Sequence, residues 1–177
     1  MRAKATRTDT IRSFSFPPVA REDARVLILG SLPGQASLEA QQYYAQPRNA
    51  FWPLMGALFG AGPEHAYADR LEKLRDVKVA LWDVCESAKR PGSLDQKIDI
   101  ASVTPNDFAA LFVRCPQIGV IGFNGATAER FYRLLVRPTL AAPHADIASA
   151  RLPSTSAAHA GRSFDEKLAL WRKALGR

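Results

Sequence analysis

The sequence predicts an α/β fold in which helices cover both faces of an open, parallel β-sheet. Short aliphatic runs at residues 26–29, 79–82 and 118–123 are typical of strands that are buried on both faces. Segments with helical apolar periodicity lie between and after these runs. Strands that alternate with helices form parallel sheets whose crossover helices pack on the two faces.

Apolar side chains at helical spacing identify four of the expected helices. Their faces carry, in chain order, Phe51, Met55, Leu58 and Phe59; Tyr67, Leu71 and Leu74; Phe108, Leu111 and Phe112; and Phe131, Leu134 and Leu135. We expect Thr104 to cap the third of these helices, with Pro105 at its first position. The proline- and alanine-rich segment 137–149 has no clear period, so we expect it to wrap the surface before a short strand near residues 150–152.

A fifth helix is predicted at the C-terminal end of the sequence. Ser163 and Glu166 have the spacing of a capping box, in which each side chain bonds the backbone of the other residue. This helix is expected to bury Phe164, Leu168, Trp171 and Leu175.

The length of 177 residues indicates a single domain. We place this domain at residues 21–177, behind a basic and flexible N-terminal arm of residues 1–20. The first sixteen residues carry four basic side chains against one acid, which are Arg2, Lys4, Arg7, Arg12 and Asp9. We expect a solvated tail here; a nucleic-acid contact and a weak organelle-targeting segment are the alternatives.

Composition excludes several classes of protein. No apolar run approaches the ~20 residues that cross a bilayer, and the N-terminus lacks the apolar segment of a secretory signal. We therefore expect a cytoplasmic monomer that works at the bacterial nucleoid and has no membrane partner. Cys85 and Cys115 have no neighbouring ligands, so we expect no metal, iron–sulfur cluster or other cofactor. The net charge of +7 favours a polyanionic partner.

The candidate site lies where the strands end, because ligands of parallel sheets bind beyond the carboxyl ends of the strands. The first strand runs into Gly30-Ser31-Leu32-Pro33-Gly34, a tight turn that exposes backbone N–H groups. This turn has neither the glycine spacing of a dinucleotide-binding loop nor the Gly-Lys-Ser/Thr of a phosphate-binding loop. Taken alone, it is best explained as an ordinary connection between a strand and a helix.

A second block, residues 43–53, places two tyrosines, a proline, a cation and an amide in one rigid loop. Tyr44, Arg48 and Asn49 suit a nucleobase, a phosphate and a water respectively. Each also has an ordinary structural explanation. Asn49 precedes a helix and can be its N-cap, Tyr44 can be half-buried core, and Arg48 can pair with an acid.

Three further features follow later strands. Asp83 ends the second strand and can accept a hydrogen bond from a ring N–H of a base, or cap a turn. Arg90 lies in a basic turn that faces either phosphates or water. Ser154, Thr155 and Ser156 form a hydroxyl cluster that either clamps a phosphate backbone or stabilises a turn. His159 suggests a Ser-His-Asp triad with Asp83, but no Gly-x-Ser-x-Gly turn is present, so we do not expect triad chemistry.

Together these motifs resemble those of the uracil-DNA glycosylase superfamily. The similarity covers residues 25–171 and is greatest to its sixth family, the hypoxanthine (deoxyinosine) DNA glycosylases. It is carried by G-S-L-P-G, Y-Y-A-x-P-R-N-A-F-W, L-W-D-V, R-P-G-S-L-D, F-N-G and L-P-S-T-S. The resemblance implies a three-layer α/β/α fold around a four-stranded parallel sheet.

The resemblance also implies roles for individual residues. Ser31 and the backbone of Gly30 and Leu32 would line the base pocket, and Asn49 would position the attacking water. Tyr44, rather than Tyr43, would stack on the extruded base, and Asp83 would read its edge. Phosphate contacts, and the filling of the gap left by that base, would fall to Arg48, Arg90, Ser154, Thr155 and Ser156.

The chain departs from the family pattern at three positions. Gln46 stands where relatives have His, Ala157 where they often have Pro, and Leu152 where classical uracil enzymes have a catalytic His. These changes bear on base preference rather than on reaction class. The expected activity is hydrolytic removal of uracil, hypoxanthine or both from single- or double-stranded DNA. A non-catalytic DNA-binding module and a small-molecule nucleotide-binding protein of the same fold are the alternatives.

Overall fold

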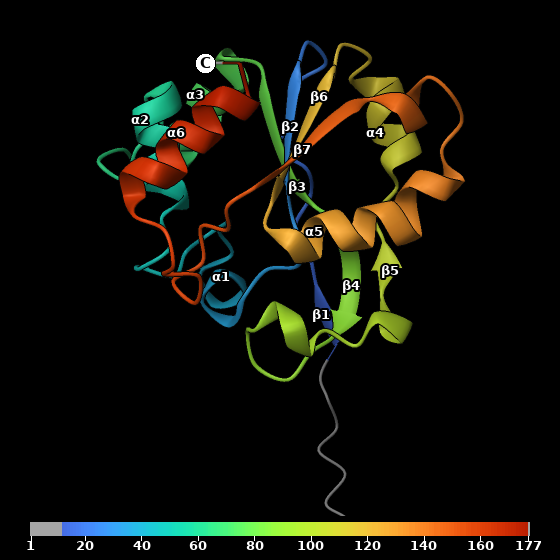
Figure 1. Cartoon of the computed structure of the whole chain (residues 1–177), viewed down its shortest axis with the longest axis horizontal. Coiled ribbons are helices and arrows are strands. Elements are labelled where there is room, and N and C mark those ends of the chain that lie inside the picture. The colour runs from blue at the N-terminus through green and yellow to red at the C-terminus, as the bar shows by residue number, and fades with distance from the viewer. Residues whose placement is uncertain (1–11, 177) are drawn as a thin grey trace, which may run out of the picture.

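A four-stranded parallel sheet lies at the centre of the molecule, in the order β3-β2-β6-β7 (Figure 1). The computed structural model describes residues 12–176. The strands are β2 (Val26–Gly30), β3 (Val79–Asp83), β6 (Val120–Asn124) and β7 (Ala148–Leu152). All three pairings are parallel, so the carboxyl ends of the four strands meet at one edge. The predicted parallel sheet is confirmed.

Helices cover both faces of this sheet, as predicted (Figure 1). One face carries α2 (Phe51–Phe59), α3 (Tyr67–Asp76) and α6 (Phe164–Ala174), and the other carries α4 (Phe108–Arg114) and α5 (Ala126–Phe131). A short helix, α1 (Gln35–Ala40), follows the turn after β2. The architecture is therefore three layers, helix on sheet on helix.

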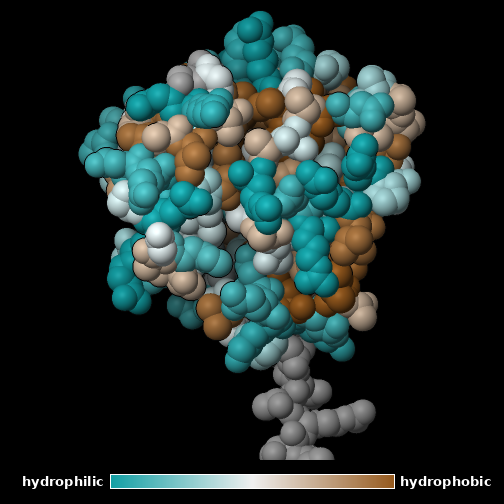
Figure 2. Space-filling view, viewed as in Figure 1, coloured by the Kyte–Doolittle hydropathy of each residue, from teal (hydrophilic) through white to brown (hydrophobic). Residues whose placement is uncertain are grey.

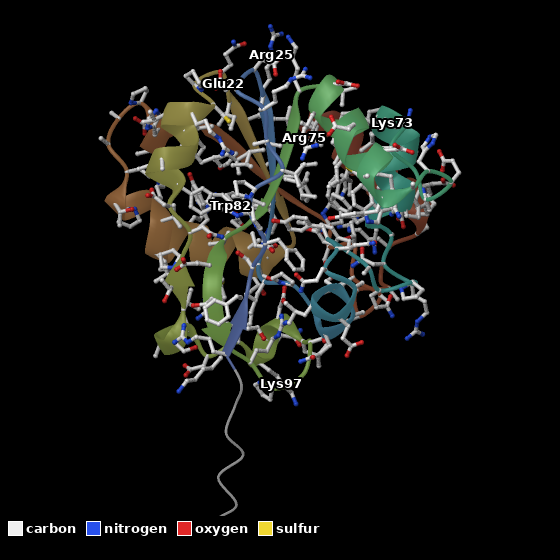
Figure 3. The ribbon with its side chains drawn as sticks, turned by 180° about the vertical axis from the view of Figure 1, so that it is seen from behind. Glu22, Arg25, Lys73, Arg75, Trp82 and Lys97 are labelled. Atoms are coloured by element: carbon white, nitrogen blue, oxygen red, sulfur yellow. The ribbon has the colours of Figure 1, made fainter. Side chains whose placement is uncertain are left out.

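Two apolar cores lie on opposite faces of the sheet. Successive residues of β2 alternate between them, with Leu27 and Leu29 in one core and Ile28 in the other. All five residues of β2 are buried, which explains its unbroken aliphatic sequence. Trp82 of β3 packs on Phe108 of α4 at 5.1 Å between ring centroids, and Figure 3 shows it beside the sheet.

A second, antiparallel sheet of order β1-β4-β5 was not predicted. It consists of β1 (Arg12–Phe14), β4 (Cys85–Lys89) and β5 (Thr104–Pro105). These strands are short, and two of them pair only with β4, which is far away in sequence, so no local pattern indicates them. Figure 1 places this sheet below the carboxyl edge of the main sheet.

Residues of the expected N-terminal arm, which we placed at 1–20, take part in the described fold from Arg12 onward. Strand β1 pairs with β4, and buried Val19 forms a bridge with Leu81 of β3. The fold therefore includes the chain from Arg12 onward. Residues 1–11, which carry most of the basic side chains of the expected arm, lie outside the described residues.

Helix boundaries differ from expectation at two places. Asp107, not Thr104, caps α4 through its side chain, because Thr104 and Pro105 pair with β4 instead. The capping box of Ser163 and Glu166 at the start of α6 is confirmed. Within α6, Trp171 is buried as predicted, but Phe164, which was also expected to be buried, is 40% exposed.

The chain between α5 and β7 is irregular but ordered into short turns. The end of α5 continues into a π-helical turn, η3 (Tyr132–Val136), and then into two 3₁₀ turns, η4 (Arg137–Thr139) and η5 (His144–Asp146). Two more 3₁₀ turns, η1 (Asp95–Lys97) and η2 (Ile100–Ser102), follow β4. Among residues 12–176, no helix has both the length and the apolar character needed to cross a membrane.

Candidate active site

A cavity of about 610 Å³ opens at the carboxyl edge of the main sheet. It lies where ligands of parallel sheets bind, and its size suits a nucleobase with its sugar. Figure 2 shows the surface hollowed between the segments that Figure 1 labels α1 and α5. Its walls come from five segments that are far apart in sequence: 30–37, 43–49, 93–96, 124–127 and 154–159.

Asp83 lies at the floor of this cavity and is only 3% exposed. It ends β3, directly beside Gly30 of β2 in the sheet register. A Cβ atom at Gly30 would stand 2.5 Å from Asp83 Oδ1 and 2.8 Å from the Tyr44 hydroxyl. Glycine is therefore required there to leave room for both side chains.

The Asp83 carboxyl is poised to meet a ligand. Its Oδ2 atom is buried and has no hydrogen-bond partner among residues 12–176. Burial, reinforced by the nearby Asp95 charge and opposed by Arg90, raises the pKa of Asp83 to about 8. An unpartnered buried carboxyl oxygen is costly, and a ligand that donates a hydrogen bond removes that cost.

Tyr44 forms a wall above this floor. Its ring stacks on Phe51 at 3.9 Å between centroids and 18° between planes, so its other face is the one available to a ligand. Its hydroxyl is buried and unpartnered among the described residues. Burial and the Asp83 charge raise the pKa of Tyr44, with Asn124 acting in the opposite direction. The hydroxyl therefore stays protonated.

Ser31 and Asp95 form a second polar pair on the cavity wall. The Ser31 hydroxyl donates to Asp95 Oδ2 at 2.6 Å. Burial raises the pKa of Asp95, while Ser31, Arg90 and His159 oppose this effect. Asp95 was not among our candidate residues, although it ends the R-P-G-S-L-D motif. No pattern in the neighbouring sequence indicates that Asp95 contacts Ser31, in the turn after β2.

Arg90 is not the outward phosphate contact that we expected. Its side chain is completely enclosed and pairs with Asp95 at 3.5 Å. It also donates to the carbonyl of Gly92 at 3.0 Å, to that of Leu32 at 3.3 Å and to that of Pro33. One guanidinium thus donates hydrogen bonds to carbonyl groups of two different loops. Arg90 therefore stabilises the loops that form the cavity and does not itself line it.

Asn49 lies one residue before the N-cap of α2, which is Ala50, so the expected N-cap is displaced by one residue, but the Asn49 side chain still bonds the start of the helix. Its Oδ1 accepts a hydrogen bond from the Phe51 backbone N–H at 2.9 Å, at the start of α2. The side chain is half-buried and lines the cavity. Its amide nitrogen makes no hydrogen bond to any residue between 12 and 176 that the structure records, so two donors are available to the cavity.

Thr155 is also structural rather than exposed to a ligand. It is 1% exposed, and its hydroxyl accepts from the Asn124 amide nitrogen at 2.9 Å. Asn124 Oδ1 in turn accepts from the Thr155 backbone N–H at 2.9 Å, and the Thr155 carbonyl accepts from the Ala50 N–H. This reciprocal pair joins the end of β6 to the hydroxyl loop. Asn124 belongs to the F-N-G motif, but we had given it no role.

The remaining candidates lie on the cavity rim. Arg48 is exposed there, with no ion pair within the part of the chain that the structure describes. The hydroxyls of Ser154 and Ser156 accept from backbone N–H groups two residues on, which stabilises the turn. Leu32 is buried and contributes backbone. The structure thus brings Gly30, Ser31, Leu32, Tyr44, Arg48, Asn49, Asp83, Ser154, Thr155 and Ser156 to one cavity.

The described residues contain no group of three or more His, Cys, Asp or Glu side chains placed to hold a metal ion. Both cysteines are buried as free thiols. The polar groups at the cavity are instead hydrogen-bond donors and acceptors, together with one exposed cation. Such a set can bind a flat heterocycle, a water and a phosphate.

Residues 17–175 match the family model described as "Uracil DNA glycosylase superfamily". The chain is 40% identical over 121 residues to the hypoxanthine DNA glycosylases of Methanosarcina barkeri and Methanosarcina acetivorans. Each alignment covers 68% of this chain and 75% of the relative. A candidate uracil DNA glycosylase from Methanosarcina acetivorans, solved by NMR in solution, matches with a TM-score of 0.73 and 35% identity, over 93% of this chain and 99% of that one.

Proposed function

Because the chain belongs to the uracil DNA glycosylase superfamily, we propose that it removes a deaminated base from DNA and leaves an abasic site. The bond cleaved is the N-glycosidic bond of uracil, hypoxanthine or both, and water is the nucleophile. The names of the curated relatives support hypoxanthine as one substrate. The residues at the cavity require no metal and no cofactor for this chemistry.

The observation that carries the proposal is the unpartnered oxygen of Asp83 at the cavity floor. Uracil and hypoxanthine both present a ring N–H beside a carbonyl, whereas cytosine and adenine present a bare ring nitrogen beside an amine. The ionised carboxylate of Asp83 accepts a hydrogen bond from the ring N–H, and this bond stabilises the ionised form. A carboxylate can only accept, so it favours the two deaminated bases over their parents, which have no ring N–H to donate at this edge.

Tyr44 stabilises the extruded base by stacking. The ring is held against Phe51, so its free face is already oriented when the base enters. Extruding a nucleotide costs a few kcal/mol, and deaminated bases in mismatches reduce that cost. Stacking of the base on the fixed Tyr44 ring offsets part of the remaining free-energy cost of extrusion.

Bond cleavage produces an oxocarbenium sugar and an anionic base. Backbone N–H groups of the turn at Ser31 and Leu32 stabilise the charge that develops on a base oxygen. The free amide donors of Asn49 hold the attacking water at the sugar carbon. An amide is a weak base, but water attacking a cation requires placement more than deprotonation.

DNA contacts come from the rim. Arg48 and the segment of Ser154 and Ser156 lie at the mouth of the cavity, where the phosphates flanking an extruded nucleotide would pass. We propose that the protein acts as a monomer, in the cytoplasm at the nucleoid. Both single- and double-stranded DNA are substrates in this proposal, and the assay below compares them.

The direct test uses end-labelled oligonucleotides with one uracil or one hypoxanthine, as single strands and as duplexes. Matched oligonucleotides with cytosine or adenine are the controls. After incubation in EDTA and treatment with alkali, we expect strand cleavage at the lesion alone. Binding without cleavage would instead identify a non-catalytic DNA-binding module.

A further inference from the structure

A second cavity lies between β1 and α1, beside the candidate active site. Its volume is about 360 Å³, which is large enough for a small organic ligand. One wall is the segment 12–16, which includes β1, and another is α1. Figures 1 and 3 view the molecule from opposite sides, and both place β1 next to α1. We call this space the β1–α1 cavity.

The β1–α1 cavity runs along the unpaired edge of β1. Every residue of the segment 12–16 lines it, although successive residues of a strand point to opposite faces of the sheet. The cavity therefore follows an edge of β1, and the other edge of this strand pairs with β4. The Ser15 N–H donates to the Glu86 carbonyl of β4 at 2.8 Å, so the backbone N–H and C=O of Phe14 point away from β4. These groups are available to a ligand.

Phe14 also supplies an aromatic ring to this cavity. It is 58% exposed and is the most exposed phenylalanine among residues 12–176. Phe16 and Leu38, both half-buried, add apolar surface. Phe16 is held edge-on to Tyr43, with 5.1 Å between ring centroids. Any nucleobase can stack on such an exposed ring, whatever its identity.

The polar lining of the β1–α1 cavity favours an anion. Arg12 donates from Nη1 to the Ser87 hydroxyl at 2.7 Å, and it forms no ion pair within the part of the chain that the structure describes. No acidic side chain of residues 12–176 lines the cavity. An arginine without an acidic partner is well suited to bind a phosphate. A cation beside an aromatic ring is typical of sites that bind single-stranded nucleic acid.

Gln35 connects the β1–α1 cavity to the candidate active site. It begins α1, is exposed, and lines both cavities. Its backbone N–H donates to the Ser93 hydroxyl at 2.9 Å, which fixes the start of α1 against the loop after β4. Because the two cavities share this wall, a DNA strand that places its lesion in the active site passes within reach of the β1–α1 cavity.

We propose that the β1–α1 cavity binds a nucleotide that neighbours the lesion in single-stranded DNA. This inference rests on the proposed function. The base of this nucleotide stacks on Phe14, and a phosphate of the strand pairs with Arg12. A base in a duplex is already stacked on its neighbours, whereas an unpaired base is free to stack on a protein ring. The site therefore strengthens the binding of single strands and not that of duplexes.

The test compares wild-type protein with Phe14→Ala, Phe14→Tyr and the control Phe164→Ala. Phe164 is also an exposed phenylalanine, but it begins α6 and lines neither cavity. We measure kcat and KM for excision from single strands of increasing length and from a duplex of the longest sequence. For long single strands, Phe14→Ala should raise KM by about tenfold with kcat unchanged, since one stacked base is lost.

The same variant should stay within about twofold of wild type on the duplex and on the shortest strand that is processed, which shows that its fold is intact. Phe14→Tyr keeps the ring and should keep the wild-type KM. Phe164→Ala should match wild type on every substrate. A KM that is unchanged in Phe14→Ala, or that rises equally for duplex and single strand, would overturn the proposal.

A second measurement reports the site without chemistry. Fluorescence anisotropy gives the affinity for labelled, undamaged oligothymidylate at several salt concentrations. Phe14→Ala should weaken binding by about tenfold, and Arg12→Gln should reduce the slope of log K against log salt by about 0.7, since one phosphate contact is lost. Equal affinities of Phe14→Ala and wild type would contradict the site. A wild-type protein that binds oligothymidylate through Phe14 but releases no base would overturn the proposed glycosylase activity and leave the site supported.

Discussion

In our proposal, Asn49 serves stability and chemistry through different atoms. Its oxygen bonds the N-terminus of α2, while its nitrogen is available to the cavity. The first role fixes the orientation that the second requires. A simple alanine substitution removes both, so it does not separate them.

We predict that Asn49→Ser separates these roles. A serine hydroxyl can cap the helix but offers no amide donors. Asn49→Ala should lose about 1 kcal/mol of stability and about a hundredfold in excision rate. Asn49→Ser should regain the stability but not the rate. The measurements are chemical denaturation and single-turnover excision, and a serine variant with the wild-type rate would exclude Asn49 as the water-positioning group.

The Asp83 carboxyl makes stability depend on pH. Its pKa is about 8 in the folded protein and about 4 in an unfolded chain, so the folded state binds the extra proton between these values. Stability should therefore fall as pH rises from about 4 to about 8, by up to about 1.4 kcal/mol per pH unit. Burial also raises the pKa of Asp95, which adds a slope of the same sign.

Asp83→Asn should remove the Asp83 contribution and retain that of Asp95. The variant should therefore gain stability relative to wild type as pH rises from 5 to 8, in about the window set by the two pKa values. Urea denaturation at several pH values measures this difference. Parallel curves for the two proteins would show that Asp83 ionises normally.

At the scale of elements, buried hydrogen bonds between loops position the site. The guanidinium of Arg90 joins the turn after β2 to the loop after β4. The Asn124–Thr155 pair joins the end of β6 to the loop after β7. The loops that form the site follow the strands of the sheet. The hydrogen bonds of Arg90 and of the Asn124–Thr155 pair fix how far apart these loops lie.

Removing the Arg90 side chain should therefore damage both the fold and the site. Arg90→Ala leaves the carbonyls of Leu32 and Pro33 and the Asp95 carboxylate without their partner. We expect a loss of about 3 kcal/mol in the free energy of unfolding. Arg114→Ala, at an exposed arginine of α4, should change it by less than about 0.5 kcal/mol. Similar unfolding curves for the two variants would contradict a bracing role.

At the scale of the whole molecule, the net charge of +7 predicts electrostatic DNA binding. The affinity for undamaged duplex should fall steeply with salt, because each phosphate neutralised releases counterions. Arg48→Ala should reduce the slope of log K against log salt by about 1, and Arg114→Ala should leave it unchanged. Fluorescence anisotropy at several salt concentrations provides the slopes. Salt-independent binding would favour a small nucleotide as the natural ligand.

Most of the residues that line the cavity could be predicted from the sequence, because they lie at or after the ends of predicted strands. The runs that became β2, β3 and β6 were predicted from their aliphatic composition, and Gly30, Asp83 and the 154–156 loop lie at or beside strand ends. Sequence reasoning assigned Arg90 to the surface because a basic turn with glycine and proline is usually solvated. It gave no role to Asp95, whose partner Ser31 is 64 residues away.

Local patterns were sufficient for the layered fold, for the capping box of α6 and for the edge at which the cavity forms. These depend on the order of apolar and turn residues within short segments, which a single sequence displays. The antiparallel sheet, the buried direction of Arg90 and the exposure of Phe14 beside α1 were decided by the tertiary structure. All three depend on tertiary contacts between segments that are distant in the sequence. Whether a side chain is buried is determined by these contacts and not by the type of residue alone.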